Sequence, residues 1–447
     1  MSETRGPIVM TLMVRDEADI VAAMIEHHLD QGVDLIIATD NASQDGTREI
    51  LAKYEALGVL ELHDDPRHNK QQAEVVTKMA RRAVDEHGAS WVINADADEF
   101  WVPADRTKTL AEVLPKLPES VRSLRVPVFN LFGAPVESGP SLSTLQWRDT
   151  RDEKSLIAVG LHAQPTPNML VRGEENLQIA QGNHFSNLPV TEPDQIDEAL
   201  RIETLHVPYR SWEQYRRRVL NTGAAYEASG LRPSPRHHGM RDYRWSRTGA
   251  LKPFFVARFP EVTAGQTSAP EGFVRDEWLT NHLRDLAKNE RVQGAIEPLL
   301  TDATPMKDAN TQRDRFTELS TPLLEMERER VEVYTGLQYA HDIAVEQRNE
   351  EHTRYVAENE RRMQLEEQVL GLRMHTEGLE AQREELGGEI EDLNAQIDAL
   401  HKQIESLNIS IVQLQEYTAS VVSNRAVRVA LAANSGVQKA KQGIRRR

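Results

Sequence analysis

Two aspartates close an apolar run in the segment 91–101, which reads WVINADADEFW. In an extended strand, residues two apart such as Asp96 and Asp98 lie on the same side. Carboxylate oxygens at the carboxyl edge of an open α/β sheet suit Mg²⁺ or Mn²⁺ carrying a diphosphate. An Asp-x-Asp pair alone is common on protein surfaces, but the apolar run and the aromatic neighbours favour a site here. We therefore expect Asp96 and Asp98 to hold a metal-bound nucleotide donor.

Strands and helices alternate ahead of this motif. Apolar runs predict strands at residues 8–14, 35–39, 59–62 and 91–94, and apolar residues at helical spacing predict helices between them. This alternation is typical of a Rossmann-like α/β fold with a mostly parallel sheet and right-handed crossovers. In such a sheet the carboxyl ends of the strands face one crevice, where ligands bind.

Polar residues follow the first, second and fourth of these strands. Because the carboxyl ends meet, we expect Arg15, Asp16, Asp40 and Asp96 to converge although they are far apart in the chain. Asp40 can accept hydrogen bonds from a nucleobase or a ribose. For Asp45 two interpretations stay open, namely ligand contact and stabilisation of the N-terminus of the following helix.

Residues 121–260 are less regular, and the run SLRVPVFNLFG at 123–133 predicts a strand followed by a turn. Neutral imidazole is a suitable further ligand for Mn²⁺, so His184 is our first additional metal ligand and His206 the second. Either histidine could instead be satisfied within the core. Lys154 and Arg210 could contact the diphosphate, whose negative charge grows as the donor bond breaks, or could lie on the surface.

Transfer of a group from a nucleotide donor to an acceptor hydroxyl needs a carboxylate that takes the proton of that hydroxyl. No spacing rule selects this catalytic residue. Glu99, next to the metal pair, is one candidate. The others lie in loop-like sequence beyond the motif and are Asp149, Asp152, Glu153, Glu174 and Glu175.

Three ordered motifs in residues 8–133 resemble the nucleotide-binding half of a GT-A glycosyltransferase of the bacterial family-2-like group. They are VRDEADIVAAMIEHHLDQGVD after the first strand, DNASQDGT after the second and DADEF after the fourth. The resemblance implies that Asp40 contacts the base, Asp96 the ribose or the metal, and Asp98 a metal that bridges both phosphates. Arg15 and Asp16 would lie along the nucleotide cleft. The resembling group also shows a lysine, a Gly-Asn-His and a His-x-Pro-Tyr-Arg-Ser in this order.

Two classes of related architecture fit less well. Sugar nucleotidyltransferases carry a glycine-rich basic loop after the first strand, whereas VRDEAD follows it here. Phosphatases of the Asp-x-Asp type place their nucleophile on the first strand, whereas here the acids follow the fourth. Both features favour a glycosyltransferase over these two classes.

Leucine recurs every seven residues from Leu365 to Leu414, and isoleucine takes the matching a positions from Ile390 to Ile411. Isoleucine at a with leucine at d favours a parallel two-stranded coiled coil, and hence a homodimer. Gly387-Gly388 costs about 1 kcal/mol per glycine relative to alanine, so we expect the N-terminal half of the coil to be looser.

The composition narrows the class of protein further. The 447 residues include no cysteine, which excludes disulfides and thiolate metal sites. The first residues lack a secretory pattern and no apolar run approaches the roughly 20 residues of a membrane helix, so we expect a soluble, cytoplasmic protein. The net charge is −17, and the negative charge is densest in residues 341–420, which hold 18 Asp and Glu against 7 Lys and Arg. The thinner negative charge of residues 1–340 argues against nucleic acid as the main partner.

Residues 421–447 hold seven lysines and arginines and no acid. Such a tail predicts contact with an anionic surface, which would place the protein peripherally at the inner face of the membrane, although a disordered solubilising tail fits equally well.

We therefore divide the chain into a GT-A domain (1–260, with a nucleotide-binding half 1–133 and an acceptor half 134–260), a helical connector (261–340), a coiled coil (341–420) and the basic tail (421–447). The predicted function is metal-dependent transfer of a sugar from a nucleoside diphosphate sugar to a glycan or cell-envelope acceptor, by an inverting reaction in which the sugar is attacked from the face opposite the leaving group. The envelope acceptor rests on the family resemblance alone. The alternative is a coiled-coil scaffold whose GT-A-like domain binds a nucleotide sugar without turnover.

Overall fold

The computed structural model describes residues 6–67, 72–229, 233–234, 236–262, 268–380, 397–417 and 420. The chain divides into two compact units, residues 1–325 and 326–447. Within the described residues, no helix has both the length and the apolar character needed to cross a membrane.

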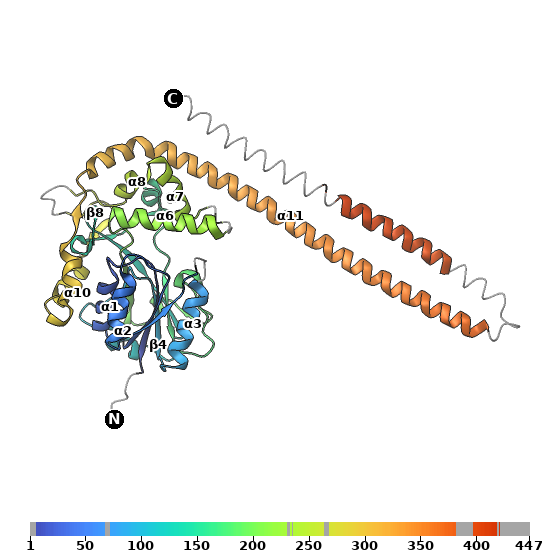
Figure 1. The fold of residues 1–447 in the computed structure, drawn as a ribbon, viewed down its shortest axis with the longest axis horizontal. Helices are drawn as coiled ribbons and strands as arrows, with labels where there is room; N and C mark the ends of the chain where they lie inside the picture. The colour runs from blue at the N-terminus through green and yellow to red at the C-terminus, as the bar shows by residue number, and fades with distance from the viewer. Residues whose placement is uncertain are drawn as a thin grey trace. The chain divides into compact units, whose positions relative to one another are not determined.

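Four adjacent parallel strands open the first unit (Figure 1). They are β1 (Ile8–Val14), β2 (Leu35–Asp40), β3 (Leu60–Asp64) and β4 (Trp91–Ala95). The helices between them are α1 (Val21–Asp30), α2 (Thr47–Ala56) and α3 (Gln72–Asp85). These bounds confirm the predicted alternation and the α/β class.

The sheet continues beyond β4 with strands of mixed direction. Its order, among the described residues, is β11-β6-β10-β4-β1-β2-β3. The added strands are β6 (Ser123–Val126), β10 (Asn168–Arg172) and β11 (Val190–Thr191). Because β10 runs antiparallel to both β4 and β6, the sheet as a whole is mixed.

Helices cover both faces of the sheet, with α1 and α2 on one side and α3 on the other (Figure 1). Alternate residues of β1 divide between two cores: Met10 packs in the core that holds α1, while Val9 packs in the core that holds α3. A strand covered on both faces needs apolar residues in both alternating sets. This explains why β1 reads as an almost continuous apolar run.

A second sheet has the order β13-β9-β7-β12-β5 among the described residues. Its strands are β5 (Glu99–Pro103), β7 (Val128–Phe132), β9 (Trp147–Asp149), β12 (Ile202–His206) and β13 (Phe273–Arg275). The single strand expected at 123–133 is therefore two strands in different sheets. Pro127 separates them, because proline has no N–H to donate to a sheet ladder.

Helices pack on both sheets. Tyr215 of α6 (Trp212–Ser229), Trp245 of α7 (His238–Thr248) and Phe255 of α8 (Leu251–Ala257) form an aromatic core with Phe132 of β7. Two further helices, α9 (Trp278–Leu286) and α10 (Glu290–Thr301), pack in the same hydrophobic core as α1. Part of the expected connector thus belongs to the first unit. Shorter elements are α4 (Leu110–Val113), α5 (Glu153–Ala158), β8 (Val136–Ser138) and β14 (Thr304–Pro305).

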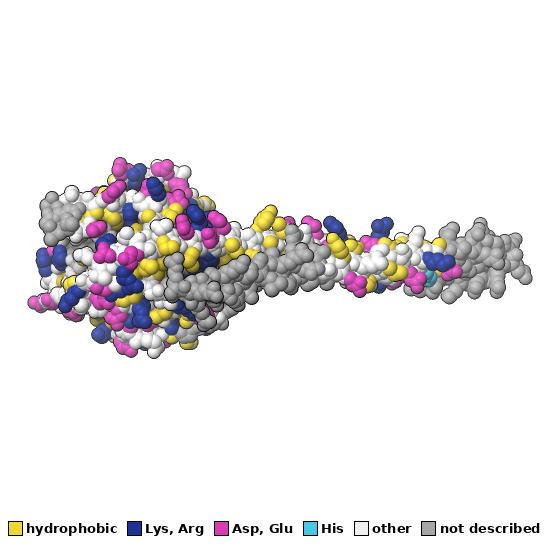
Figure 2. Space-filling model, turned by 90° about the horizontal axis from the view of Figure 1, so that it is seen from above, with side chains coloured by type: hydrophobic (Ala, Val, Ile, Leu, Met, Phe, Trp, Pro, Cys, Tyr) yellow, Lys and Arg dark blue, Asp and Glu magenta, His cyan; other side chains and the backbone are white. Residues whose placement is uncertain are grey.

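Acidic and basic side chains are interspersed over the face of the first unit seen in Figure 2. Such a mixture is typical of a solvated protein surface.

The second unit contains most of α11 (Ala309–Glu380) and a helical segment at residues 397–417. Arg362 donates a hydrogen bond to Asn408 at 2.9 Å, whereas 46 residues of straight helix would separate them by about 69 Å. The two helical segments therefore lie side by side in one chain, with Val369 and Ile404 buried. At these residues the heptad positions of the predicted coil (341–420) therefore pack within one chain.

The parallel homodimer itself stays a prediction, because the structure contains a single chain. Gly387-Gly388 lies outside the described residues, as does the basic tail 421–447 with its expected membrane contact.

Candidate functional site

The acidic motif is the junction between the two sheets. Asp96, Ala97 and Asp98 form a turn that leads from β4 into β5. The expectation that Asp96 and Asp98 share one side assumed extended backbone, which the turn does not have. The pairing of β5 with β12 places His206 opposite Glu99, and the imidazole Nε2 lies 3.5 Å from Asp98 Oδ1. A long-range strand register thus brings His206 to the motif.

Two basic side chains face Asp98. Besides His206, Arg218 of α6 lies with Nη1 3.3 Å from Asp98 Oδ2. Burial alone would raise the pKa of Asp98, but the charge and hydrogen bond of His206 and the charge of Arg218 hold it well below its usual range. Burial would lower the pKa of His206, and the Asp98 carboxylate raises it above its ordinary value instead. Asp98 is therefore a carboxylate whose charge is already balanced.

Asp96 and Glu99 have the opposite character. Burial, together with the nearby Asp98 charge, raises the pKa of Asp96 to about 6. Its Oδ1 accepts hydrogen bonds from Gln72 and Asn183, both at 3.2 Å. Burial and the Asp96 charge raise the pKa of Glu99 to about 8, and Glu99 is only 6% exposed. At neutral pH most Glu99 side chains are protonated, which does not suit a general base.

The donor set for a divalent cation is incomplete in this arrangement. No group of three or more His, Asp or Glu side chains in the described part of the chain is placed to hold a metal ion. Asp98 is paired with His206 and Arg218, and Asn183 rather than His184 contacts the acidic turn. Burial lowers the pKa of His184, whose imidazole hydrogen-bonds to the backbone of Pro167. The residues as arranged therefore do not fit a bound Mn²⁺ or Mg²⁺.

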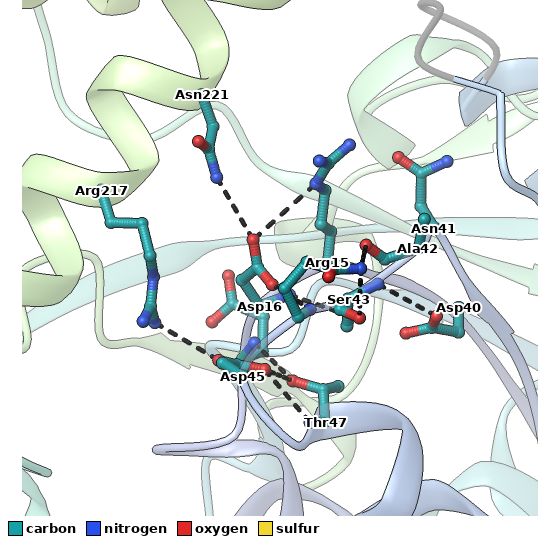
Figure 3. Close-up of polar contacts among 12 residues, drawn as sticks. Arg15, Asp16, Asp40, Asn41, Ala42, Ser43, Asp45, Thr47, Arg217 and Asn221 are labelled. Carbon is teal, nitrogen blue, oxygen red and sulfur yellow. Dashed lines mark hydrogen bonds and ion pairs between the residues drawn. The ribbon is translucent and has the colours of Figure 1, made fainter.

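Asp16 joins the loops after β1 and β2 to α6 (Figure 3). Its φ of +56° is in the left-handed region, which Asp tolerates better than most residues. Its N–H donates to Ser43 Oγ at 3.0 Å, Oδ1 accepts from Gln44 N–H at 2.7 Å, and Oδ2 accepts from Asn221 at 3.2 Å. Asp16 is thus a structural bridge at the mouth of the predicted crevice.

Asp40 ends β2 and is only 2% exposed. Its Oδ2 accepts a hydrogen bond from Ser43 N–H at 3.1 Å, while Oδ1 has no hydrogen-bond partner among the described residues. A buried carboxylate oxygen normally has a partner, so this atom is suited to a donor group of a ligand.

Asp45 accepts a hydrogen bond from the Thr47 N–H at 3.1 Å, which confirms its role at the N-terminus of α2.

A cavity of about 540 Å³ opens between these loops and α6. The loop residues that line it include Arg15, Asp16, Glu17 and Asn41. The α6 residues that line it are Gln214, Arg217, Arg218, Asn221, Thr222, Ala224 and Ala225. This α6 set was missed from the sequence, although the polar residues in it recur at helical spacing and include two of the three arginines at 216–218.

Arg210 is placed among carboxylates instead of on the cavity wall. It is 1% exposed, forms an ion pair with Glu17, and its Nε lies 3.1 Å from Asp19 Oδ2. Burial is the main cause that raises the pKa of Glu17 to about 7, and the Arg210 charge opposes it. Because Glu17 also lines the cavity, Arg210 positions an acid with a near-neutral pKa there.

The remaining predicted site residues lie elsewhere in the first unit. Lys154 and Glu153 are exposed on α5, and Asp152 caps this helix by accepting from the Ser155 N–H at 2.8 Å. Asp149 is paired with Arg151 at 2.7 Å. Glu174 is paired with Arg122, and Glu175 is exposed. Among the residues that line the described cavity, none of these side chains appears.

The comparison with protein families matches part of this architecture. Residues 9–134 match the model of glycosyltransferase family 92, and these residues hold β1 to β7 with the acidic turn. The match identifies this N-terminal segment as a glycosyltransferase domain. The sequence resemblance also pointed to a glycosyltransferase, but to the family-2-like group, whereas the matching model is that of family 92. The match spans less than a third of the chain.

No curated protein matches the chain. Solved structures with detectable similarity include S. aureus TarS 1–349 in complex with UDP-GlcNAc, at 11% identity, covering 74% of this chain and 92% of that one, with a TM-score of 0.31. Another is M. tuberculosis glucosyl-3-phosphoglycerate synthase with Mn²⁺, UDP and glucosyl-3-phosphoglycerate, at 13% identity, covering 61% and 87%, with a TM-score of 0.24.

Proposed function

We propose that the protein transfers a sugar from a nucleoside diphosphate sugar to a glycan or cell-envelope acceptor. One observation carries this proposal: the glycosyltransferase segment borders a cavity of about 540 Å³ whose wall includes Arg15, Arg217 and Arg218. Ligand pockets of this size hold molecules as large as a nucleotide, and arginine is the preferred partner of phosphate groups. The acceptor class rests on the sequence resemblance alone.

The polar groups around the cavity suit the parts of such a donor. Asp40 does not line the cavity, but it directly precedes Asn41, which does, and its buried Oδ1 has no partner among the described residues. We propose this atom as the acceptor of a hydrogen bond from the base or the ribose. Arginines near the phosphates stabilise the negative charge that the departing nucleoside diphosphate develops. Glu17, which Arg210 orients, is the cavity carboxylate with a pKa of about 7 and can accept the proton of an acceptor hydroxyl in an inverting transfer.

The predicted Mn²⁺ or Mg²⁺ has no role in this proposal. The sequence resemblance assigns Asp96, Asp98, His184 and His206 to it, but the described arrangement does not fit the ion. The homodimer that the heptads predict stays a proposal based on sequence pattern alone, and the pairing of Arg362 with Asn408 within one chain is the competing arrangement. The cytoplasmic location and a peripheral membrane contact of residues 421–447 likewise stay proposals based on sequence pattern.

A thermal-shift screen of the full-length protein with nucleotide sugars, followed by assay of nucleoside diphosphate release, tests the proposal. A donor that binds the folded state raises the melting temperature, and a transferase then releases its nucleoside diphosphate slowly to water or faster to an acceptor. Binding with no release in any acceptor mixture would favour the non-catalytic scaffold. No shift with any nucleotide sugar, with or without Mn²⁺, would contradict both functions.

A further inference from the structure

We propose that Arg217 and Arg218 of α6, with Arg15, bind the diphosphate of the donor and supply its counter-charge without a divalent cation. The inference rests on the proposed function and names the groups that would distinguish a nucleoside diphosphate from a monophosphate. The sequence motif predicts a metal site at Asp96 and Asp98, but Asp98 is already paired with His206 and Arg218.

Arg217 and Arg218 project from the face of α6 that lines the cavity. Residues three and four apart on a helix share a face, and Gln214, Arg217, Arg218 and Asn221 follow this spacing. Figure 3 shows Arg217 and Asn221 directed from the helix toward the loops that hold Asp45 and Asp16. Arg217 therefore reaches the loop after β2, while Arg218 reaches the turn between β4 and β5. Both guanidinium groups come from one helix and border the same cavity.

Each arginine is held by a carboxylate on one side. Arg217 Nη2 lies 3.3 Å from Asp45 Oδ2, and Arg218 Nη1 lies 3.3 Å from Asp98 Oδ2. Arg218 also donates through Nη2 to the Pro208 carbonyl at 2.6 Å. A guanidinium has five N–H donors, so these contacts fix both side chains and leave donors for a ligand. The arginine side chains remain 40% and 35% exposed, respectively.

The charge around Asp98 favours arginine over a metal ion. Asp98 already faces His206 and Arg218. A divalent cation bound to this carboxylate would have to displace both side chains or be repelled by their positive charge. Removing a partner from a buried charge pair is costly. A diphosphate that enters the cavity instead meets guanidinium groups that keep further N–H donors beside their carboxylate partners, and the forked arrangement of these donors matches phosphate oxygens.

The test compares nucleoside diphosphates with their monophosphates on the full-length protein in EDTA, by calorimetry and thermal shift. The probes are UDP and UMP, GDP and GMP, and ADP and AMP, so that the base need not be known. We expect the wild type to prefer one diphosphate over its monophosphate. In Arg217→Gln/Arg218→Gln this preference should fall about tenfold or more, since a hydrogen bond to a charged group contributes about 1.5–3 kcal/mol. Monophosphate affinity should change little.

Arg216→Gln is the matched control, because it removes the same charge from the same helix at an exposed position outside the cavity wall. It should keep the preference for the diphosphate. Arg217→Gln alone removes only the described pair with Asp45, and it reports on the site if the double variant does not fold. It should lower the preference by itself, and Arg217→Lys should restore part of it.

Two results would overturn the inference. One is a diphosphate preference that survives in the double variant or in Arg217→Gln. The other is a preference that vanishes in EDTA and returns with Mn²⁺. In both cases the nucleotides still bind, so the proposed function would stand. If no nucleotide binds the wild type under any condition, the proposed function fails together with this inference.

Discussion

At the scale of single residues, three carboxyl groups within four positions have very different pKa values. Asp98 is held low by His206 and Arg218, Asp96 is raised to about 6, and Glu99 is raised to about 8. Burial raises the pKa of all three groups. The Asp98 charge raises the pKa of Asp96 further and the Asp96 charge raises that of Glu99, whereas His206 and Arg218 lower the pKa of Asp98. The turn therefore keeps one firmly ionised acid beside one that is mostly neutral at pH 7.

Replacing Glu99 with glutamine should make stability less sensitive to alkaline pH. The raised pKa of Glu99, about 8 in the folded state against 4.5, contributes stability that is fully present below pH 4.5 and is lost as the pH rises through 8. Glutamine keeps the shape and never ionises. We expect Glu99→Gln to match the wild type near pH 5 and to exceed it by up to about 4 kcal/mol at pH 9 in urea unfolding. Equal stabilities at pH 9 would contradict the raised pKa.

Arg210 should be essential to the stability of the first unit. Its guanidinium lies between Glu17 and Asp19, and all three groups are removed from water to a large extent. Arg210→Met would leave two carboxylates without their partner, at a cost of about 3–5 kcal/mol in the free energy of unfolding. Arg210→Met/Glu17→Gln/Asp19→Asn removes the charges together and should recover part of the loss. A loss below about 1 kcal/mol in Arg210→Met would show that the pairs are not needed.

At the scale of elements, local patterns predicted the parallel half of the sheet well. The apolar run at Ile8–Val14 gives β1 with the same bounds, because a strand covered on both faces must be apolar throughout. The position of His206 beside Asp98 could not be predicted in the same way, because it depends on the register of β12 against β5, about 100 residues apart. The α6 arginines were missed because a polar helix face that lines a cavity has the same sequence pattern as a solvated face.

The packing of α7 on α6 depends on a glycine within α6. A Cβ added at Gly223 would lie 2.2 Å from the Tyr243 ring, whereas one added at Gly294 of α10 would meet nothing within 4 Å. Alanine is normally favoured over glycine inside helices by about 1 kcal/mol. Gly294→Ala should therefore stabilise the protein by about 0.5–1 kcal/mol, while Gly223→Ala should destabilise it by about 1–3 kcal/mol through overpacking. Urea unfolding of both variants measures the contrast, and equal gains would refute the close approach.

At the scale of the whole molecule, the heptad pattern predicted helices but not their partner. Apolar a and d positions can pack against a second chain or against another segment of the same chain, and the sequence is compatible with both. The hydrogen bond between Arg362 and Asn408 belongs to the second arrangement.

Since the chain has no cysteine, introduced thiols can distinguish these arrangements. Arg362→Cys/Asn408→Cys, treated with a short flexible bis-maleimide to which both thiols add, should give a crosslinked single chain on a denaturing gel if the helices fold back. In a parallel two-stranded coil, Arg362→Cys alone would link two chains, because residue 362 falls at an a position of the heptads. We expect the intrachain product, and a crosslinked dimer from the single variant would support the parallel coil instead.

The proposed function requires that the donor binds in the cavity between α6 and the loops after β1 and β2. The most direct measurement is calorimetric binding of the nucleoside diphosphate identified in the screen to Ala225→Trp, which fills this cavity from an exposed position on α6. Ala56→Trp, at an exposed position of α2 outside the cavity wall, is the control. We predict that Ala225→Trp folds with an unchanged melting temperature and loses binding, while the control keeps it. Full binding by a folded Ala225→Trp would place the donor elsewhere and contradict the account.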